Sequence, residues 1–225
     1  MLNFQTQPKA NNMDKMIDIG LMELLTSKIC HDLISPIGAV ANGVEFMEEM
    51  GADAGEEATS LIKFSALQAS AKLQSYRMAY GAGGGDTSIK PEDVHTTFNK
   101  FIELDKKIKQ DWNPYGPLGP EERSAGFSKL LMCALILCAE CLPKGGTIKV
   151  EEAGANITRI KASGEDAALK EPMAAALDHS MPREAVEPRY VHAYITHLLA
   201  DQYGFELKYN GANGETIEFL LRSPQ

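Results

Sequence analysis

The chain has 225 residues, of which 44% are hydrophobic and 24% are charged, a composition typical of a soluble globular protein. Its formal net charge of −9 leaves no basic face to neutralise phosphates, which argues against a nucleic-acid partner. No apolar run reaches the roughly 18 residues of a membrane span, and the first residues lack the pattern of a secretory signal. We therefore expect neither a nucleic-acid nor a membrane partner.

The first predicted element is a long helix from about Met13 to Met50. Apolar residues recur in it at steps of three and four: Met22, Leu25, Ile29, Leu33, Ile37, Val40, Val44 and Met47. This spacing predicts one buried helix face, and at about 100° per residue His31 falls roughly opposite its centre. Pro36 lacks an N–H donor and is expected to kink the helix or to loosen the preceding turn.

The outward face of this helix carries an imidazole beside a carboxylate. His31 precedes Asp32, and Ser35, Gly38 and Asn42 follow at helical spacing on the same face. Neutral imidazole is a nucleophile for phosphoryl groups near neutral pH, and a neighbouring carboxylate can hold one ring nitrogen as N–H. The alternative is an ordinary surface histidine next to a helix acid, and the pair alone does not decide between them.

A second helix is predicted from about Glu56 to Tyr80, after a break at Gly51–Gly55. Its apolar or small residues form a heptad-like seam: Ile62, Ala66, Ala69, Leu73, Tyr76 and Tyr80. Two long helices with a short connection predict an antiparallel hairpin that cannot bury both apolar faces alone. We therefore predict a homodimer that forms a four-helix bundle. Gly81–Gly85 is predicted to be a linker, since it lacks the Gly-Lys-Ser/Thr ending of a P-loop.

The remainder predicts a sheet covered by helices on one face, an α+β fold. Helices are expected at 91–103, 121–142, 167–176 and 188–203, and strands at 106–112, 147–152, 157–163, 205–209 and 216–222. We accordingly predict two domains, a helical hairpin at 13–82 and an α/β domain at 86–225.

The four cysteines allow two interpretations. Cys133, Cys138 and Cys141 match the first three cysteines of a plant-type iron–sulfur pattern, to which Cys30 could add a fourth. However, residues 130–142 predict one straight helix, which spreads thiols over its sides, and free cysteine is commonly buried. We expect reduced thiols in the core of a cytosolic protein and no metal site.

Three further histidines, His179, His192 and His197, raise the possibility of a second metal site. His192 and His197 are five residues apart, whereas two ligands on one helix face need a spacing of four. We expect these histidines to be ordinary residues of the fold.

The run His-Asp-Leu-Ile-Ser-Pro at 31–36 resembles the H-box of sensor histidine kinases, whose common form is His-Glu-Leu-Arg-Thr-Pro. The resemblance covers nearly the whole chain, as a two-helix dimerisation domain followed by an α/β domain like the kinase ATP-binding domain. The nucleotide motifs, however, differ. Cys133 and Leu137 replace the N-box asparagines, 162–165 (Ala-Ser-Gly-Glu) replaces Asp-x-Gly-x-Gly, and 187–190 (Glu-Pro-Arg-Tyr) replaces a glycine-rich loop. Without these groups we expect no Mg-ATP binding.

An H-box hairpin joined to a degenerate ATP domain resembles the ChpT-type histidine phosphotransferases of alphaproteobacteria. The resemblance implies that His31 is the phosphoacceptor and that Asp32 orients or deprotonates its imidazole. Ser35 matches the H-box hydroxyl, whose chemical role here is left open.

The same resemblance implies a cytoplasmic phosphorelay. The receiver domain of a CckA-like hybrid kinase would donate the phosphoryl group, and CtrA-like and CpdR-like response regulators would accept it. In this family, receivers dock toward the hairpin tip, which implicates the outward faces of Ile34–Glu48 and Glu57–Lys72. Near the histidine, the residues expected to bind the receiver are Ile34, Ser35, Gly38 and Asn42. The chain is expected to bind no cofactor, since the receiver supplies Mg²⁺.

Three functions thus compete. A phosphotransferase would gain label from a phosphorylated receiver, an ATP-dependent histidine kinase would gain it from ATP alone, and a non-catalytic scaffold would bind receivers without transfer. The exposed His-Asp pair favours the phosphotransferase.

Overall fold

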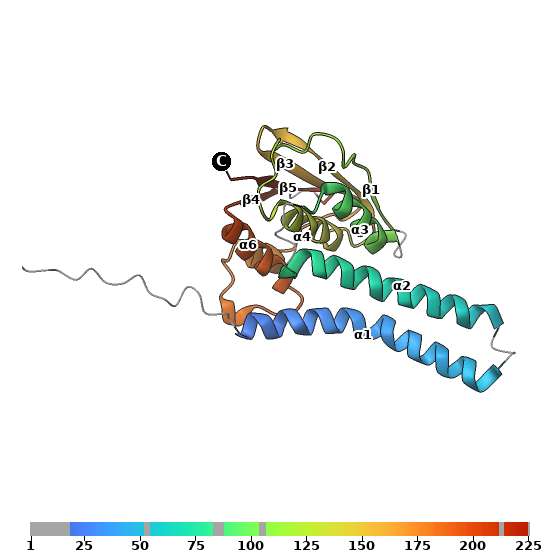
Figure 1. Cartoon of the computed structure of the whole chain (residues 1–225). Coiled ribbons are helices and arrows are strands. Elements are labelled where there is room, and N and C mark those ends of the chain that lie inside the picture. Colours follow the sequence, from blue (N-terminus) through green and yellow to red (C-terminus); the bar gives the residue numbers. More distant parts are fainter. Residues whose placement is uncertain (1–18, 52–54, 83–87, 104–106, 212–213, 225) are drawn as a thin grey trace, which may run out of the picture.

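The computed structural model describes residues 19–51, 55–82, 88–103, 107–211 and 214–224. Figure 1 shows a twisted sheet, a layer of helices beneath it, and a long helical hairpin beneath those helices. The helices are α1 (Ile19–Met50), α2 (Gly55–Tyr80), α3 (Pro91–Glu103), α4 (Phe127–Glu140), α5 (Glu171–Leu177) and α6 (Val191–Tyr203), with a 3-10 turn at Arg183–Ala185. The strands are β1 (Ile108–Gln110), β2 (Gly146–Gly154), β3 (Ile157–Ser163), β4 (Glu206–Asn210) and β5 (Thr216–Arg222). The predicted α+β class, with an N-terminal helical hairpin, is confirmed.

The sheet has the strand order β1-β2-β3-β5-β4, in which β1 and β2 are parallel and the other pairs are antiparallel. Apolar residues alternate with polar ones, so that Ile160 lies opposite Phe219 on the buried face while Lys161 lies opposite Glu218 on the other. One face therefore packs on the helices and the other meets solvent, in agreement with the predicted sheet covered by helices on one face. Strand β1 ends at Gln110, before the predicted end at residue 112, because its pairing with β2 covers Ile108–Gln110, and predicted residue 106 lies outside the described residues.

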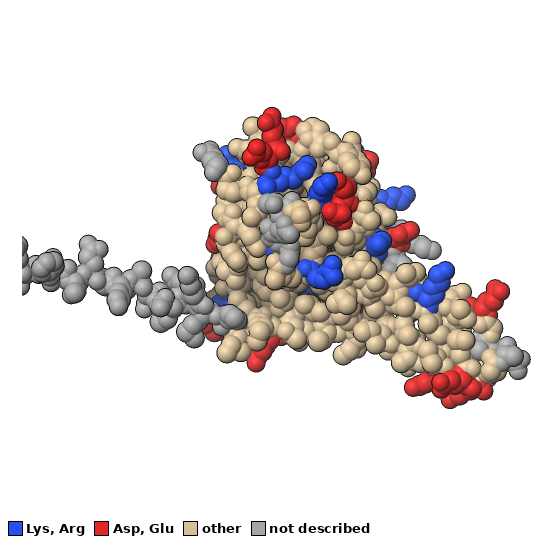
Figure 2. All heavy atoms as spheres, in the orientation of Figure 1, with Lys and Arg blue, Asp and Glu red and all other residues tan. Residues whose placement is uncertain are grey.

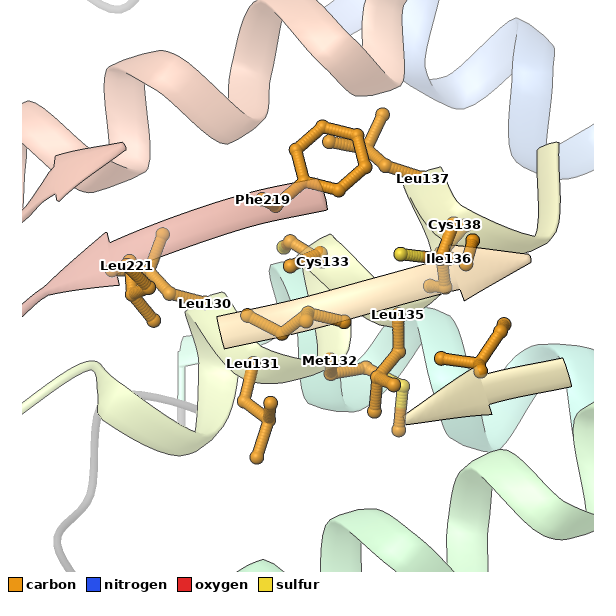
Figure 3. Close-up of a cluster of buried hydrophobic side chains, with 14 of the residues drawn as sticks. Leu130, Leu131, Met132, Cys133, Leu135, Ile136, Leu137, Cys138, Phe219 and Leu221 are labelled. Atoms are coloured by element: carbon orange, nitrogen blue, oxygen red, sulfur yellow. The ribbon is translucent and has the colours of Figure 1, made fainter. Parts of the chain in front are cut away.

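Helix α4 is the centre of the core. Residues 127–138 are all buried, because α4 lies between the sheet and α2, and this explains its apolar character on every side. Figure 3 shows its side chains beside Phe219 and Leu221 of β5. The core position predicted for Cys133, Cys138 and Cys141 is confirmed, and all three are fully buried. Within the described ranges, no group of three or more potential ligand side chains is arranged to hold a metal ion.

The predicted start of α4 at Glu121 is wrong, since the helix begins at Phe127. The residue before it, Gly126, has φ of 88°, and a Cβ atom there would overlap the ring of Tyr203. A left-handed backbone conformation interrupts any helix that approaches from the N-terminal side, and at this close approach glycine is required.

Two other helices also begin later than predicted. Helix α5 begins at Glu171 rather than Ala167, because Pro172 fits only the first turn of a helix. Helix α6 begins at Val191 rather than Pro188, because the preceding residues form a hydrogen-bonded turn.

The most buried residues of the hairpin of α1 and α2 are mostly small, and the predicted apolar stripe is only partly shielded. The buried residues of α1 are Pro36 and Gly43, and a Cβ atom on Gly43 would overlap Ile62 of α2. The prediction that the whole stripe forms a buried face is therefore wrong for a single chain. Four of its members are 39–55% exposed: Met22, Ile37, Val44 and Met47. Helix α1 continues through Pro36, whereas the predicted helical residues 13–18 and most of the predicted linker lie outside the described residues.

Candidate functional site

The predicted outward position of His31 is confirmed. Its side chain is 87% exposed in the middle of α1. Ile34 is 71% exposed, Ser35 and Asn42 are also exposed, and Gly38 is half-buried. The residues expected to meet a partner therefore lie along an accessible stretch of one helix.

Asp32 connects this exposed histidine to the interior of the hairpin. Its side chain is 16% exposed, and the two carboxylate oxygens have different partners. Oδ1 lies 3.3 Å from Nδ1 of His31, whereas Oδ2 accepts hydrogen bonds from Lys28, at 2.7 Å, and from the hydroxyl of Tyr76. Lys72 of α2 also donates to the backbone carbonyl of Asp32, at 3.1 Å. The carboxylate is thus held from α1 and from α2.

The two sets of partners fix the tautomer of the imidazole. An ionised carboxylate only accepts hydrogen bonds, so Nδ1 of His31 must be the N–H nitrogen in the neutral ring. Nε2 then carries the lone pair on a side chain that solvent reaches. The arrangement is that of a nucleophile oriented by a neighbouring carboxylate, which is itself oriented by two donors.

The electrostatics of the site keep Asp32 ionised. Burial raises the pKa of Asp32, but hydrogen bonds from Lys28 and Tyr76 outweigh burial, and the net pKa lies below its usual value. Burial, together with the hydrogen bond to the Asp32 carboxylate, raises the pKa of Tyr76, so its hydroxyl remains a donor. The group facing His31 is therefore a carboxylate at neutral pH.

A second histidine lies in the interior, close to the same part of α2. His192 of α6 is 1% exposed, its Nε2 donates to the carbonyl of Cys133 at 3.0 Å, and its Nδ1 accepts from the hydroxyl of Tyr80. Burial lowers the pKa of His192 to about 4, so its ring is neutral. The sequence predicted an ordinary residue of the fold, and this position fits that prediction.

The rings of His179 and His197 contact each other, with their centroids 4.1 Å apart and their planes tilted by 33°. The sequence did not predict that contact.

Sequence reasoning missed the residues that hold Asp32. Lys28 precedes Asp32 by one helical turn, a spacing that predicts ion pairs, so that signal was present. Tyr76 appeared only as a member of an apolar seam, and Glu140 appeared only as part of the core helix. Glu140 in fact reaches the same cluster, where its Oε1 lies 3.7 Å from Nζ of Lys28.

Comparison with known proteins places this geometry in a family. A family model described as the histidine phosphotransferase C-terminal domain matches residues 91–215. The chain is 35% identical over 207 residues to the protein phosphotransferase ChpT of Brucella abortus (strain 2308), an alignment that covers 90% of this chain and 94% of that protein. The chain belongs to the histidine phosphotransferase family. A solved bacterial phosphotransferase matches this phosphotransferase with a TM-score of 0.74 and 30% identity, over 92% of this chain and 98% of that one.

In this phosphotransferase, other parts of the chain cover the face of α4 that we align with the N-box of kinases. Cys133 and Leu137 are fully buried, and Sγ of Cys133 lies 3.8 Å from the carbonyl of Ala79 in α2. Lys129, one turn earlier, donates to the carbonyls of Ala79 and Gly81, at 3.1 Å and 2.8 Å. The end of α2 therefore packs directly on this face.

Across the described part of the chain, no helix combines the length and the hydropathy that a membrane span needs.

Proposed function

We propose that this protein is a phosphorelay intermediate, in which Nε2 of His31 accepts a phosphoryl group from the aspartate of one receiver domain and passes it to another. The observation that carries the proposal is the exposed imidazole whose Nδ1 faces a fixed, ionised Asp32. Membership of the histidine phosphotransferase family supports it.

The chemistry requires little from this chain beyond a positioned nucleophile. The lone pair on Nε2 attacks phosphorus, the bond between phosphorus and the donor aspartate oxygen breaks, and the aspartate leaves as a carboxylate. The phosphorylated ring is then cationic with its proton on Nδ1, and Asp32 stabilises that charge. The reverse attack, by the aspartate of a second receiver, restores the neutral imidazole. Receivers supply the Mg²⁺ and the cationic groups that balance the phosphoryl charge, so His31 needs orientation more than activation.

The phosphoryl group comes from an aspartate and not from ATP in this proposal. The burial of Cys133 against the end of α2 supports this step, because a nucleotide would need that face open, and Leu137 one turn later is also fully buried. The sequences at 162–165 and 187–190 support it as well. The first segment lacks the aspartate that contacts adenine in kinases, and the second lacks the glycines that contact the phosphates.

Dimerisation through the hairpin is the second part of the proposal. Residues 33–44 of α1 include no charged residue, and Figure 2 shows a stretch along the hairpin without charged side chains. Apolar residues of α1 and α2 are exposed in the single chain, among them Ile37 and Leu73 at 55% and 54%. A second copy would bury them in a four-helix bundle and leave one His31 on each protomer.

Receiver domains would dock on α1 beside His31 and toward the hairpin tip, where we expect contacts with Ile34, Ser35, Gly38 and Asn42. Gly38 supports this placement. A glycine within a helix costs about 1 kcal/mol relative to alanine, yet a Cβ atom on Gly38 would meet nothing within 4 Å. The chain itself does not need the space that this glycine leaves, whereas a closely approaching partner does.

The proposed donor is the receiver domain of a CckA-like hybrid kinase. CtrA-like and CpdR-like regulators are the proposed acceptors, in the cytoplasm.

The test is phosphoryl transfer from a ³²P-labelled receiver domain of a hybrid kinase to the purified protein. The wild-type protein should gain label, and His31→Ala should gain none. The His31→Ala substitution should change the free energy of unfolding by less than about 0.5 kcal/mol, since His31 is exposed. Labelled ATP alone should leave the wild type unlabelled.

Three results would contradict the proposal. If the His31→Ala variant gains label, a residue other than His31 is the phosphoacceptor. Label from ATP alone would make the protein a kinase. Receiver binding without any label would make it a scaffold.

A further inference from the structure

An ion pair joins the helical layer of the fold to the phosphoacceptor site. Glu140 is the last residue of α4, and its Oε1 lies 3.7 Å from Nζ of Lys28 in α1. The same Nζ lies 2.7 Å from Oδ2 of Asp32. Lys28 therefore stands between a carboxylate of the hairpin and a carboxylate of α4.

These three side chains are mostly shielded from water. Lys28, Asp32 and Glu140 have exposed side-chain fractions of 18%, 16% and 25%. Charges interact more strongly in such an environment than at the open surface, where ion pairs contribute little. Oε2 of Glu140 is buried and has no hydrogen-bond partner among the described residues, which makes glutamate an expensive choice for stability alone.

A small cavity beside the cluster leaves the position of the lysine to electrostatics. It has a volume of about 230 Å³, and Lys28, Lys72, Tyr76, Asp32 and Glu140 are among the residues that line it. Packing alone does not fix an ammonium group that borders open space. The location of Nζ therefore depends on the two carboxylates that attract it.

We propose that Glu140 is a positioning residue, which holds Lys28 on the Oδ2 side of Asp32 and so keeps Oδ1 for His31. Without the Glu140 charge, the ammonium group is free to move toward both oxygens of Asp32. It then competes with the Nδ1–H of His31 for Oδ1, and the Nδ1–H tautomer loses its preference. The degenerate ATP-like region thus acts on the nucleophile through one side chain of α4. The effect on transfer rests on the proposed function, whereas the effect on the tautomer does not.

The test compares Glu140→Gln with the wild type by ¹⁵N NMR of the histidine rings, together with transfer from a phosphorylated receiver. It is performed at pH 8, because burial raises the pKa of Glu140 to about 7 although Lys28 lowers it, and the carboxylate is then ionised. We expect the ratio of Nδ1–H to Nε2–H tautomers at His31 to fall roughly three- to tenfold, and transfer to slow by a similar factor.

Glu151→Gln is the matched control. It removes the same charge from a carboxylate that pairs with Arg159 at 2.9 Å on the exposed face of the sheet. It should leave the tautomer ratio and the transfer rate unchanged.

A double-mutant cycle with Lys28→Met separates positioning from a general loss of structure. In that background the link is absent, so Glu140→Gln should have no further effect on the tautomer or on transfer. An unchanged tautomer ratio in the single variant, or an equal effect in both backgrounds, would overturn the inference. If wild-type protein accepts no phosphoryl group at all, the proposed function fails, and the tautomer ratios still decide the role of Glu140.

Discussion

His31 and His192 each belong to a hydrogen-bond network that includes a tyrosine of α2, and those two tyrosines, Tyr76 and Tyr80, stack with ring centroids 5.9 Å apart. The surroundings of the two histidines differ completely. His31 is 87% exposed and contacts its tyrosine through Asp32, whereas His192 is 1% exposed and contacts Tyr80 directly. Both ring nitrogens of His192 are hydrogen-bonded, whereas His31 has Nδ1 beside Asp32 and an exposed side chain.

The comparison teaches that residue type alone does not mark a nucleophile. A histidine with both nitrogens engaged in the interior stabilises the fold, because breaking either hydrogen bond leaves a buried polar atom unpaired. A histidine with one nitrogen held by a carboxylate and the other in solvent is prepared for chemistry. Substitutions at the two networks should therefore separate stability from transfer.

Among substitutions that leave His31 in place, the largest effect is expected for Asp32→Asn, which should slow transfer by on the order of 10²- to 10³-fold. Lys28 can only donate, so the amide oxygen of the new side chain should remain on the Lys28 side. The amide NH₂ group then faces His31 and forces Nδ1 to accept, which moves the ring proton onto Nε2 and blocks the attack. Single-turnover transfer from a labelled receiver measures the change. A rate within about threefold of wild type would contradict the role given to this carboxylate.

The next effect is the contribution of His192 to the pH dependence of the free energy of unfolding. Its pKa falls from an ordinary 6.5 to about 4 on burial, so folding favours the neutral ring. The stabilisation is complete above about pH 6.5 and is lost as the pH falls toward 4. Between these values the wild type should lose roughly 3 kcal/mol more unfolding free energy than His192→Gln.

Urea denaturation across that range provides the measurement. The two proteins share every other titrating group, so the difference between their curves isolates His192. Parallel curves would show that this histidine can be protonated in the folded state.

The smallest effects come from the matched pair Tyr76→Phe and Tyr80→Phe. Tyr80→Phe leaves Nδ1 of His192 unpaired in the core and should cost about 1–3 kcal/mol of stability without slowing transfer. Tyr76→Phe should slow transfer about two- to fivefold with a smaller loss of stability, because Asp32 keeps Lys28 and is close to solvent. Denaturation and transfer assays on both variants test the separation. If both variants change the same property, the two networks are not distinct.

Local patterns in the sequence carried much of this account. The apolar spacing of residues 22–47 predicted the exposure of His31, and the predicted strands lie close to the observed ones, because helix faces and strands depend on neighbours within a few residues. The boundary at Gly126 was not predicted, and part of the requirement for glycine there is the close approach of Tyr203, which is distant in the sequence.

The side chains that position Asp32 were not predicted either. Tyr76 of α2 donates to Asp32 directly, and Glu140 of α4 contacts Lys28, which in turn pairs with Asp32, across contacts that no local pattern encodes. The apolar stripe is instructive for a different reason. Its spacing was found correctly, but its burial requires a surface that a single chain does not supply.

The measurement that tests the central claim most directly is the location of the phosphoryl group after transfer from a receiver. Mass spectrometry identifies the modified residue, and ³¹P NMR distinguishes a phosphoryl group on Nε2 from one on Nδ1. We predict a single phosphohistidine at His31 with phosphorus on Nε2, since Asp32 faces Nδ1. Phosphorus on Nδ1, or on any residue other than His31, would contradict the account.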